Sequence, residues 1–399
     1  MFTKQNNAYA HTIRASFISF IIQAILVNFA PLLFLTFQSS YGLSFAQITT
    51  LITANFVTQL VVDLISVKYA QRLGTRNCML LAHATITAGF LGLALFPALS
   101  ERLFSTAYVG LVVAVMLYAI GGGLIEVIGS PLVEACPSQH KAATMSLLHS
   151  FYCWGHVFVV VASTIFFALF GLANWKILAV IWALVPLCNG IYFCFVPIPA
   201  LEGAHTLSVK TLAKNKLFWV LLLLMVCAGA AEQAMSQWAS TFAEEGLGVS
   251  KTIGDLAGPC LFAICMGVAR VFYGKFGEKI DLSKFMIASG ALCILSYLVV
   301  AFSPLPIFAF VASAVCGLAV GIMWPGTVSI GAEKIPAGGT AMFAFFALAG
   351  DVGCTVGPTT VGLVFGSSAQ LQTGFTAALI FPAVLILGIL FCRKYSGKA

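Results

Sequence analysis

Long apolar stretches separated by short polar breaks run along the whole chain. A transmembrane helix needs about 20 mainly apolar residues. Stretches of that length recur often enough to predict twelve transmembrane helices. The predicted spans are roughly 12–38, 45–70, 77–98, 107–134, 140–170, 174–197, 216–242, 251–276, 283–302, 305–332, 337–366 and 372–392.

The composition supports a membrane setting for all of these stretches. Hydrophobic residues make up 60% and charged residues 8% of 399 residues, and the mean hydropathy is +1.02. So little polar surface cannot cover a water-soluble globule. The first apolar stretch, 11–38, is too long for the core of a signal peptide, so we interpret it as a retained span. We therefore expect an integral membrane protein of the all-α class, in contact with the lipid bilayer and without a soluble catalytic domain.

The basic residues are distributed unevenly over the polar breaks. Three (Arg102, Lys176 and Lys251) fall in breaks on one side, Arg270 falls inside a span, and the remaining sixteen of twenty fall on the side of the termini. Those sixteen are Lys4, Arg14, Lys68, Arg72, Arg76, Lys141, Lys210, Lys214, Lys216, Lys275, Lys279, Lys284, Lys334, Arg393, Lys394 and Lys398. Because cytoplasmic loops carry the excess of Lys and Arg, we expect both termini in the cytoplasm of a cell whose plasma or inner membrane holds the protein. The net charge of +7 then reflects orientation and anionic lipid, and no nucleic-acid partner is needed.

The longest polar break divides the chain near its middle. We predict a six-helix bundle over 1–197, a cytoplasmic linker over 198–215 and a second six-helix bundle over 216–399. The halves echo each other, since Gln71–Gly74 resembles Gly274–Gly277 and Glu134–Pro137 resembles Glu333–Pro336. Two pseudo-symmetric parallel repeats of this size are typical of the major facilitator fold.

The stretch from Gly121 to Val157 carries the strongest functional signal. It places Glu126 deep in one predicted helix and His149 and Tyr152 in the next, with a turn near Ser138. In an antiparallel pair these three side chains lie at one depth. Charges at such depth are costly and usually mark a substrate or proton pathway. A purely structural carboxylate that joins the two helices is the alternative.

Other polar residues inside the spans extend this candidate site, because unpaired amides and charges are expensive in hydrocarbon. The predicted solute ligands are Asn28, Asn55, Gln59, Glu126, His149, Tyr152, Glu232, Gln237, Trp238 and Trp324, of which Glu126 and His149 are also the predicted proton carriers. The predicted gating or structural residues are Asp63, Arg72, Arg76, Glu134, Arg270 and Asp351. We expect Asp63, Glu134 and Glu333 to pair with Arg72, Arg76 or Lys141, and Asp351 to pair with Arg270. Helix-to-helix hydrogen bonding is the alternative for the amides.

The chain resembles the major facilitator superfamily, and within it the branch typified by the fucose:proton symporters. The resemblance rests on Gly123-x-x-Glu126 with Pro131, and on Leu147-x-His149-Ser150-Phe151-x-x-x-Gly155. The strings Glu232–Trp238, Gly267-x-x-Arg270 and Trp324-Pro325 also fit it. It implies that Glu126 is the proton-linked glutamate of the branch and that His149 stands at its glutamine position.

Two departures from that branch matter. The branch carries an aspartate in the first helix where this chain has Pro31, so one of two coupling acids is missing. The loop between the second and third helices, a signature of the superfamily, is reduced to Val67-x-x-x-Gln71-Arg72-Leu73-Gly74-Thr75-Arg76, although its glycine and two basic positions remain.

The sequence thus predicts a monomeric secondary transporter for a small polar solute. A monosaccharide is preferred, because acids and amides satisfy hydroxyls and aromatic faces cover the C–H side of a sugar ring. No phosphate-binding G-x-x-x-x-G-K-[ST] loop is present, so we expect proton symport rather than a nucleotide to supply the energy. The twelve cysteines show no metal-ligand spacing, and we expect no cofactor or metal.

Three alternatives to this hypothesis remain. An exporter of drugs or amphiphiles would use the same fold, and an uncoupled facilitator would fit the missing aspartate. A membrane-embedded enzyme would need more than Glu126 and His149, so we predict that the protein is not an enzyme.

Overall fold

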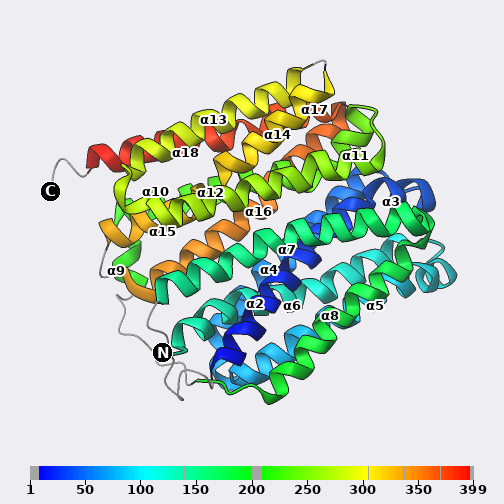
Figure 1. The fold of residues 1–399 in the computed structure, drawn as a ribbon, viewed down its shortest axis with the longest axis horizontal. Helices are drawn as coiled ribbons and strands as arrows, with labels where there is room; N and C mark the ends of the chain where they lie inside the picture. Colours follow the sequence, from blue (N-terminus) through cyan, green and yellow to red (C-terminus); the bar gives the residue numbers. More distant parts are fainter. Residues whose placement is uncertain are drawn as a thin grey trace. The chain divides into compact units, whose positions relative to one another are not determined.

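The computed structural model describes residues 9–137, 141–199, 209–303, 305–335, 338–368 and 370–395. Within these ranges the chain is helical and contains no strand (Figure 1). It divides into two compact units, Met1–Glu202 and Gly203–Ala399. Much of the predicted linker and the predicted turn near Ser138 lie outside the described residues.

The first unit contains six membrane-length segments. Its helices are α2 (Ala10–Asn28), the 3₁₀ helix η1 (Ala30–Leu33), α3 (Phe34–Tyr41), α4 (Phe45–Leu73), α5 (Thr75–Phe104), α6 (Tyr108–Ala135), α7 (Lys141–Phe170), the 3₁₀ helix η2 (Leu172–Asn174) and α8 (Trp175–Phe195). Helix α2 packs against α6, α7 and α8, and α5 packs against α6 and α8. Because α2 touches three other helices, its polar side chains can reach several of them.

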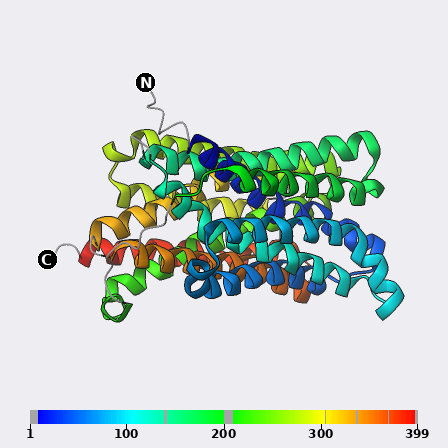
Figure 2. The same cartoon turned by 90° about the horizontal axis from the view of Figure 1, so that it is seen from below.

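The second unit also contains six membrane-length segments, several of them interrupted. Its helices are α9 (Val209–Ala213), α10 (Lys216–Thr241), the π-helix η3 (Phe242–Gly246), α11 (Lys251–Asp255), the π-helix η4 (Leu256–Cys260), α12 (Leu261–Phe276), the 3₁₀ helix η5 (Gly277–Lys279), α13 (Leu282–Phe302), α14 (Pro306–Val320), α15 (Met323–Lys334), α16 (Gly339–Ser368), α17 (Leu371–Ala378) and α18 (Ile380–Tyr395). Helix α10 packs against α16 and α18, and α12 packs against α14. Figure 2 shows the helices from a second direction as long rods.

Twelve segments of the described chain are long and apolar enough to cross a membrane. They confirm the predicted number of spans. The side chains on their outer surfaces are apolar as well: on α8, Ile177, Leu184, Ile191 and Phe195 are all exposed. A surface stripe of large aliphatic and aromatic side chains is stable in hydrocarbon and unfavourable in water, so the outer surface agrees with the membrane setting.

Prolines account for most interruptions that the apolar pattern did not predict. A proline cannot donate to the carbonyl four residues earlier, and its ring clashes with that carbonyl. Pro31 follows the end of α2 at Asn28, Pro259 lies in η4, Pro325 follows the break between α14 and α15, and Pro382 follows the break between α17 and α18. Each predicted single helix at these places is therefore two or three helical pieces.

Candidate functional site

Three polar side chains from three helices meet inside the first unit. The Gln23 side chain on α2 donates through Nε2 to Oε1 of Gln59 on α4, at 2.8 Å, and to Oε2 of Glu126 on α6, at 3.5 Å. Gln23 and Gln59 are almost fully buried, whereas Glu126 is half-buried. One amide thus holds another amide and a carboxylate at a common depth.

Glycines on α6 make room for this cluster. A Cβ at Gly122 would lie 3.0 Å from Oε1 of Gln59 and 3.2 Å from Oε1 of Gln23. A Cβ at Gly123 would lie 2.9 Å from a carboxylate oxygen of Asp63. Small residues allow helices and polar side chains to approach closely in a membrane. The glycine run beside Glu126 therefore lets the α4 amide and carboxylate reach the α6 backbone.

The structure brings His149 to the same face of α2 as Glu126. The His149 ring packs edge-on against Phe20, with ring centroids 5.4 Å apart, and Phe20 also covers Gly129 of α6. Phe20 lies one turn before Gln23, the partner of Glu126. Glu126 and His149 therefore contact neighbouring residues of α2, Gln23 and Phe20 respectively. His149 is exposed and Tyr152 is half-buried in the unit.

Gln23 was not among the predicted site residues. The signal was available, because Gln23 is an amide in the middle of an apolar span, as Asn28 is. The amide of Asn28 instead donates to the carbonyl of Ala24 in its own helix, at 2.9 Å. Asn55 is buried one turn before Gln59 on α4, and Asp63 is buried one turn after it. The three α4 side chains therefore share one helix face.

A second polar chain lies on α10 and α12 in the second unit. Gln237 donates to Oε1 of Gln233 at 3.1 Å, and Gln233 donates to Oε1 of Glu232 at 3.3 Å. The guanidinium of Arg270 forms an ion pair with Oε2 of Glu232 at 3.2 Å. Gln233, which the sequence analysis left out, is the link between the predicted ligands Glu232 and Gln237.

The two predicted tryptophan ligands both pack against neighbouring helices. Trp238 is completely buried, and its indole N–H donates to the carbonyl of Pro358 on α16, at 2.9 Å. The Trp324 ring lies against the backbone at Gly350, so closely that a Cβ there would overlap the ring. The Trp238 indole N–H thus joins α10 to α16.

Two guanidinium groups have partners that the sequence did not predict. Arg270 forms an ion pair with Glu232 on the facing helix α10, and its pairing with Asp351 stays a prediction. Arg76, one of the three bases expected to pair with Asp63, Glu134 or Glu333, donates to the carbonyls of Phe193, Cys194 and Val196 at the end of α8. A guanidinium has five N–H donors, so it can satisfy several carbonyls left open at a helix end.

Arg72, Glu134 and Glu333 lie near helix ends, whereas Asp351 lies in the middle of α16. Glu333 pairs with its neighbour Lys334, at 3.0 Å. Arg72 and Glu134 are exposed, and Asp351 is buried on α16. The side chain of Lys141 lies outside the described part of the structure.

A third buried polar group joins α2, α5 and α8. His83 Nδ1 lies 2.6 Å from the carbonyl of Met79 and must donate to it. The other ring nitrogen, Nε2, then accepts from Asn189 at 2.8 Å. Ser19 Oγ lies 3.3 Å from the same nitrogen. This geometry requires a neutral imidazole, so His83 is a structural hydrogen-bonding residue.

The comparisons agree with this fold. The family model described as Major Facilitator Superfamily matches residues 15–358, and the chain belongs to this family. It is therefore a membrane transporter by family. A search of curated proteins gives no match.

Several solved transporters have a similar fold. The fucose:proton symporter of E. coli, in an N162A variant, is 16% identical, with a TM-score of 0.67 over 96% of this chain and 99% of that chain. A D-xylose-proton symporter is also 16% identical, with a TM-score of 0.79 over 97% and 98%. A bacterial homologue of the human lysosomal transporter Spinster, in an inward-facing and occupied conformation, is 13% identical, with a TM-score of 0.73 over 98% of both chains.

Proposed function

We propose that the protein is a secondary active transporter that moves a small polar solute, a monosaccharide, by alternating access together with protons. The observation that carries this proposal is the buried cluster of Gln23, Gln59 and Glu126. Amides and a carboxylate at one depth match the donors and acceptors of sugar hydroxyl groups. The likeness of the fold to fucose and xylose symporters supports the same solute class.

Glu126 is the proton carrier in this proposal. An ionised carboxylate only accepts hydrogen bonds, whereas a protonated one also donates. In its ionised form Glu126 accepts from the Gln23 amide, which also holds Gln59. Protonation weakens that charge-assisted bond and gives the site a new donor. His149 on α7 packs against the same face of α2, and we assign it as the second member of the proposed proton pair.

The second unit supplies solute positioning in this proposal. The ion pair with Arg270 neutralises Glu232, and the glutamines extend the polar row along α10. We therefore assign further solute contacts to Glu232, Gln233 and Gln237, and the proton exchange to Glu126. The position of Pro31, where the symporter branch has an aspartate, favours uncoupled facilitation as the second candidate.

Uptake into proteoliposomes tests both candidates. A panel of labelled monosaccharides is offered with and without an inward proton gradient. We expect accumulation above equilibrium only with the gradient, whereas a facilitator would equilibrate its solute under both conditions. Failure of every sugar to enter would reject the proposed solute class.

The variant Glu126→Gln tests the proton role. Glutamine imitates the protonated carboxyl group, so we expect solute binding and exchange to persist and gradient-driven accumulation to disappear. Glu101→Gln is the matched control, because Glu101 is an exposed acid at the end of α5 in the same unit. If Glu126→Gln accumulates solute at the parent rate, Glu126 does not carry the proton. Parallel loss of yield, exchange and accumulation would indicate a structural carboxylate.

A further inference from the structure

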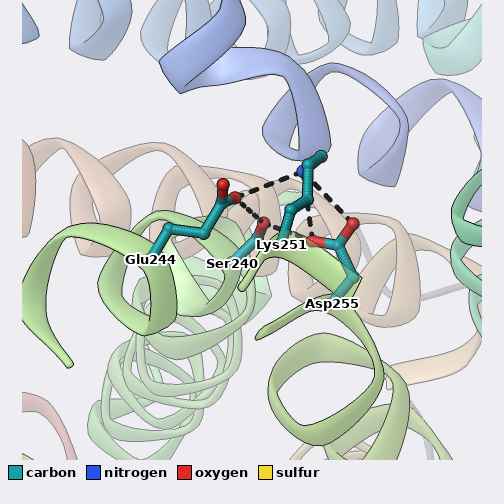
Figure 3. A network of polar contacts seen from close by, with 4 residues as sticks. All are labelled: Ser240, Glu244, Lys251 and Asp255. Carbon is teal, nitrogen blue, oxygen red and sulfur yellow. Dashed lines mark hydrogen bonds and ion pairs between the residues drawn. The ribbon is translucent and has the colours of Figure 1, made fainter. Parts of the chain in front are cut away.

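A charged network ties α10 to α11 at the end of the second unit opposite Lys216 (Figure 3). The ammonium of Lys251 lies 3.3 Å from Glu244 and 3.2 Å from Asp255. The hydroxyl of Ser240 donates to Asp255 at 2.5 Å and to Glu244 at 3.4 Å. Ser240, Glu244 and Asp255 were not among the predicted site residues.

Only some of these contacts connect the two helices. The pair Lys251–Asp255 lies within α11, four residues apart, and therefore cannot hold α11 to its neighbour. The contacts Lys251–Glu244 and Ser240–Asp255 cross from α11 to η3 and α10. Two polar cross-links thus close this hairpin.

The backbone beside the network is not regular α-helix. The π-helices η3 and η4 follow α10 and α11, and Pro259 lies within η4. Such π-helical turns are rare and are often found at functional sites. Two of the close contacts across the hairpin involve small groups: Gly254 faces Ala243, and Gly258 faces Ala239. Such contacts bury little apolar area, so the polar cross-links add to the closure of the hairpin.

The charges of the network do not balance. Two carboxylates share one ammonium, so the fully ionised network carries a net charge of −1. The carboxylate of Asp255 is fully buried, whereas the side chain of Glu244 is 18% exposed. Glu244 is therefore the carboxylate of the network that is accessible to protons from the solvent. Protonation removes the charge attraction between Glu244 and Lys251, and with it one of the two cross-links.

We propose that Glu244, Lys251, Asp255 and Ser240 form a proton-sensitive latch for the α10–α11 hairpin. The latch is closed when Glu244 is ionised and opens when Glu244 takes up a proton. It is independent of which solute the transporter carries. The charged groups that act on Glu244 are Lys251 and Asp255. Glu245 is the next acid along η3 and is exposed, and α17 contributes the ring of Phe375 against Phe242.

Hydrogen exchange of the purified protein, without any solute, measures the latch directly. Protection factors of the amides in 240–260 are compared at about pH 7.5 and about pH 5, after division by the intrinsic exchange rates. Loss of one charge-assisted cross-link should lower protection about tenfold at the acidic pH. In Glu244→Gln we expect the low protection at both pH values, because glutamine imitates the protonated acid.

In the variant Lys251→Met we expect protection to respond to pH in the opposite direction. Without the ammonium, Glu244 and Asp255 repel each other when both are ionised, so acidification should raise protection in this variant. Glu333→Gln is the control, because it removes an exposed ion pair elsewhere in the unit and should leave the response of 240–260 unchanged. Equal protection of the parent protein at both pH values, or an unchanged pH response in Glu244→Gln, would overturn the latch. The folding of each variant is checked by its melting curve in the same detergent.

Discussion

Each unit holds a glutamate beside a glutamine within its apolar spans. In the first unit Gln23 donates to Glu126, and in the second Gln233 donates to Glu232. The further contacts differ. Gln23 also donates to the amide oxygen of Gln59, whereas Glu232 also forms an ion pair with the guanidinium of Arg270. The guanidinium of Arg270 compensates the charge of Glu232, which suits solute positioning, whereas the Gln23 amide gives Glu126 a neutral hydrogen-bond donor. This difference between residues underlies the roles that we propose for Glu126 and Glu232.

We expect the ion pair of Glu232 and Arg270 to affect the stability of the protein. Both side chains are largely buried, at 9% and 15% exposure. Removal of one partner leaves an uncompensated charge, so Arg270→Met should cost about 3–5 kcal/mol of unfolding free energy. The double variant Glu232→Gln/Arg270→Met should recover part of that loss. Denaturant unfolding in one detergent measures the unfolding free energies of the parent protein, the single variant and the double variant.

The pair of Glu333 and Lys334 is the control for this experiment. Glu333 is 65% exposed, and exposed ion pairs contribute about 0–1 kcal/mol. Glu333→Gln should therefore leave stability nearly unchanged. A double variant at 232 and 270 that is less stable than Arg270→Met alone would contradict the proposed role of charge compensation.

Glycines set the distance between the two central helices of the second unit. On α16, Gly353 faces the carbonyl of Val226, and Gly357 faces the backbone of Ala230. Gly229 on α10 faces the carbonyl of Gly350. This close approach brings the Trp238 indole within hydrogen-bonding distance of the Pro358 carbonyl. At the scale of elements, the α10–α16 contact therefore fixes the helix that carries Glu232, Gln233 and Gln237.

Two alanine substitutions on α16 distinguish the effect of close packing on stability from the effect of helix propensity. At Gly353 a methyl group would overlap the α10 backbone, so Gly353→Ala should destabilise the protein by about 1–3 kcal/mol. At Gly366 nothing lies within 4 Å, and Gly366→Ala should stabilise the helix by about 0.5–1 kcal/mol. Thermal unfolding of both variants measures the difference. Equal effects at the two positions would show that α10 and α16 are not in tight contact.

At the scale of the whole molecule, the even number of candidate spans in the described chain predicts that its two ends lie on the same side of the membrane. The excess of basic residues in the breaks on that side predicts that it is the cytoplasmic side. The same prediction places the charged network of Glu244, Lys251 and Asp255 on the outer side, where it would meet the external pH. The latch and the topology are therefore testable together.

Cysteine labelling in intact cells tests the topology. An impermeant thiol reagent should label Glu245→Cys and should not label Lys279→Cys until the cells are opened. Both positions are exposed in the structure. The exposed native thiols of Cys188 and Cys194 are first replaced by serine, which removes their background reaction. Labelling of Lys279→Cys from outside would invert the proposed orientation.

The sequence by itself determined the helical class and the number of spans, because the thickness of hydrocarbon fixes the length of an apolar run. It also pointed to Glu126, since a carboxylate within such a run is rare and costly. It did not foresee the breaks around Pro259, Pro325 and Pro382, because the apolar pattern continues through them.

Only the tertiary structure decided the partners of the polar side chains. The link from Gln23 to Glu126, the pairing of Arg270 with Glu232, and the contact of Arg76 with the α8 carbonyls each join residues far apart in the chain. The same holds for Trp238, whose indole N–H donates to the carbonyl of Pro358. Helix rotation and the choice of neighbouring helix select these partners, and both depend on packing between helices rather than on any local pattern.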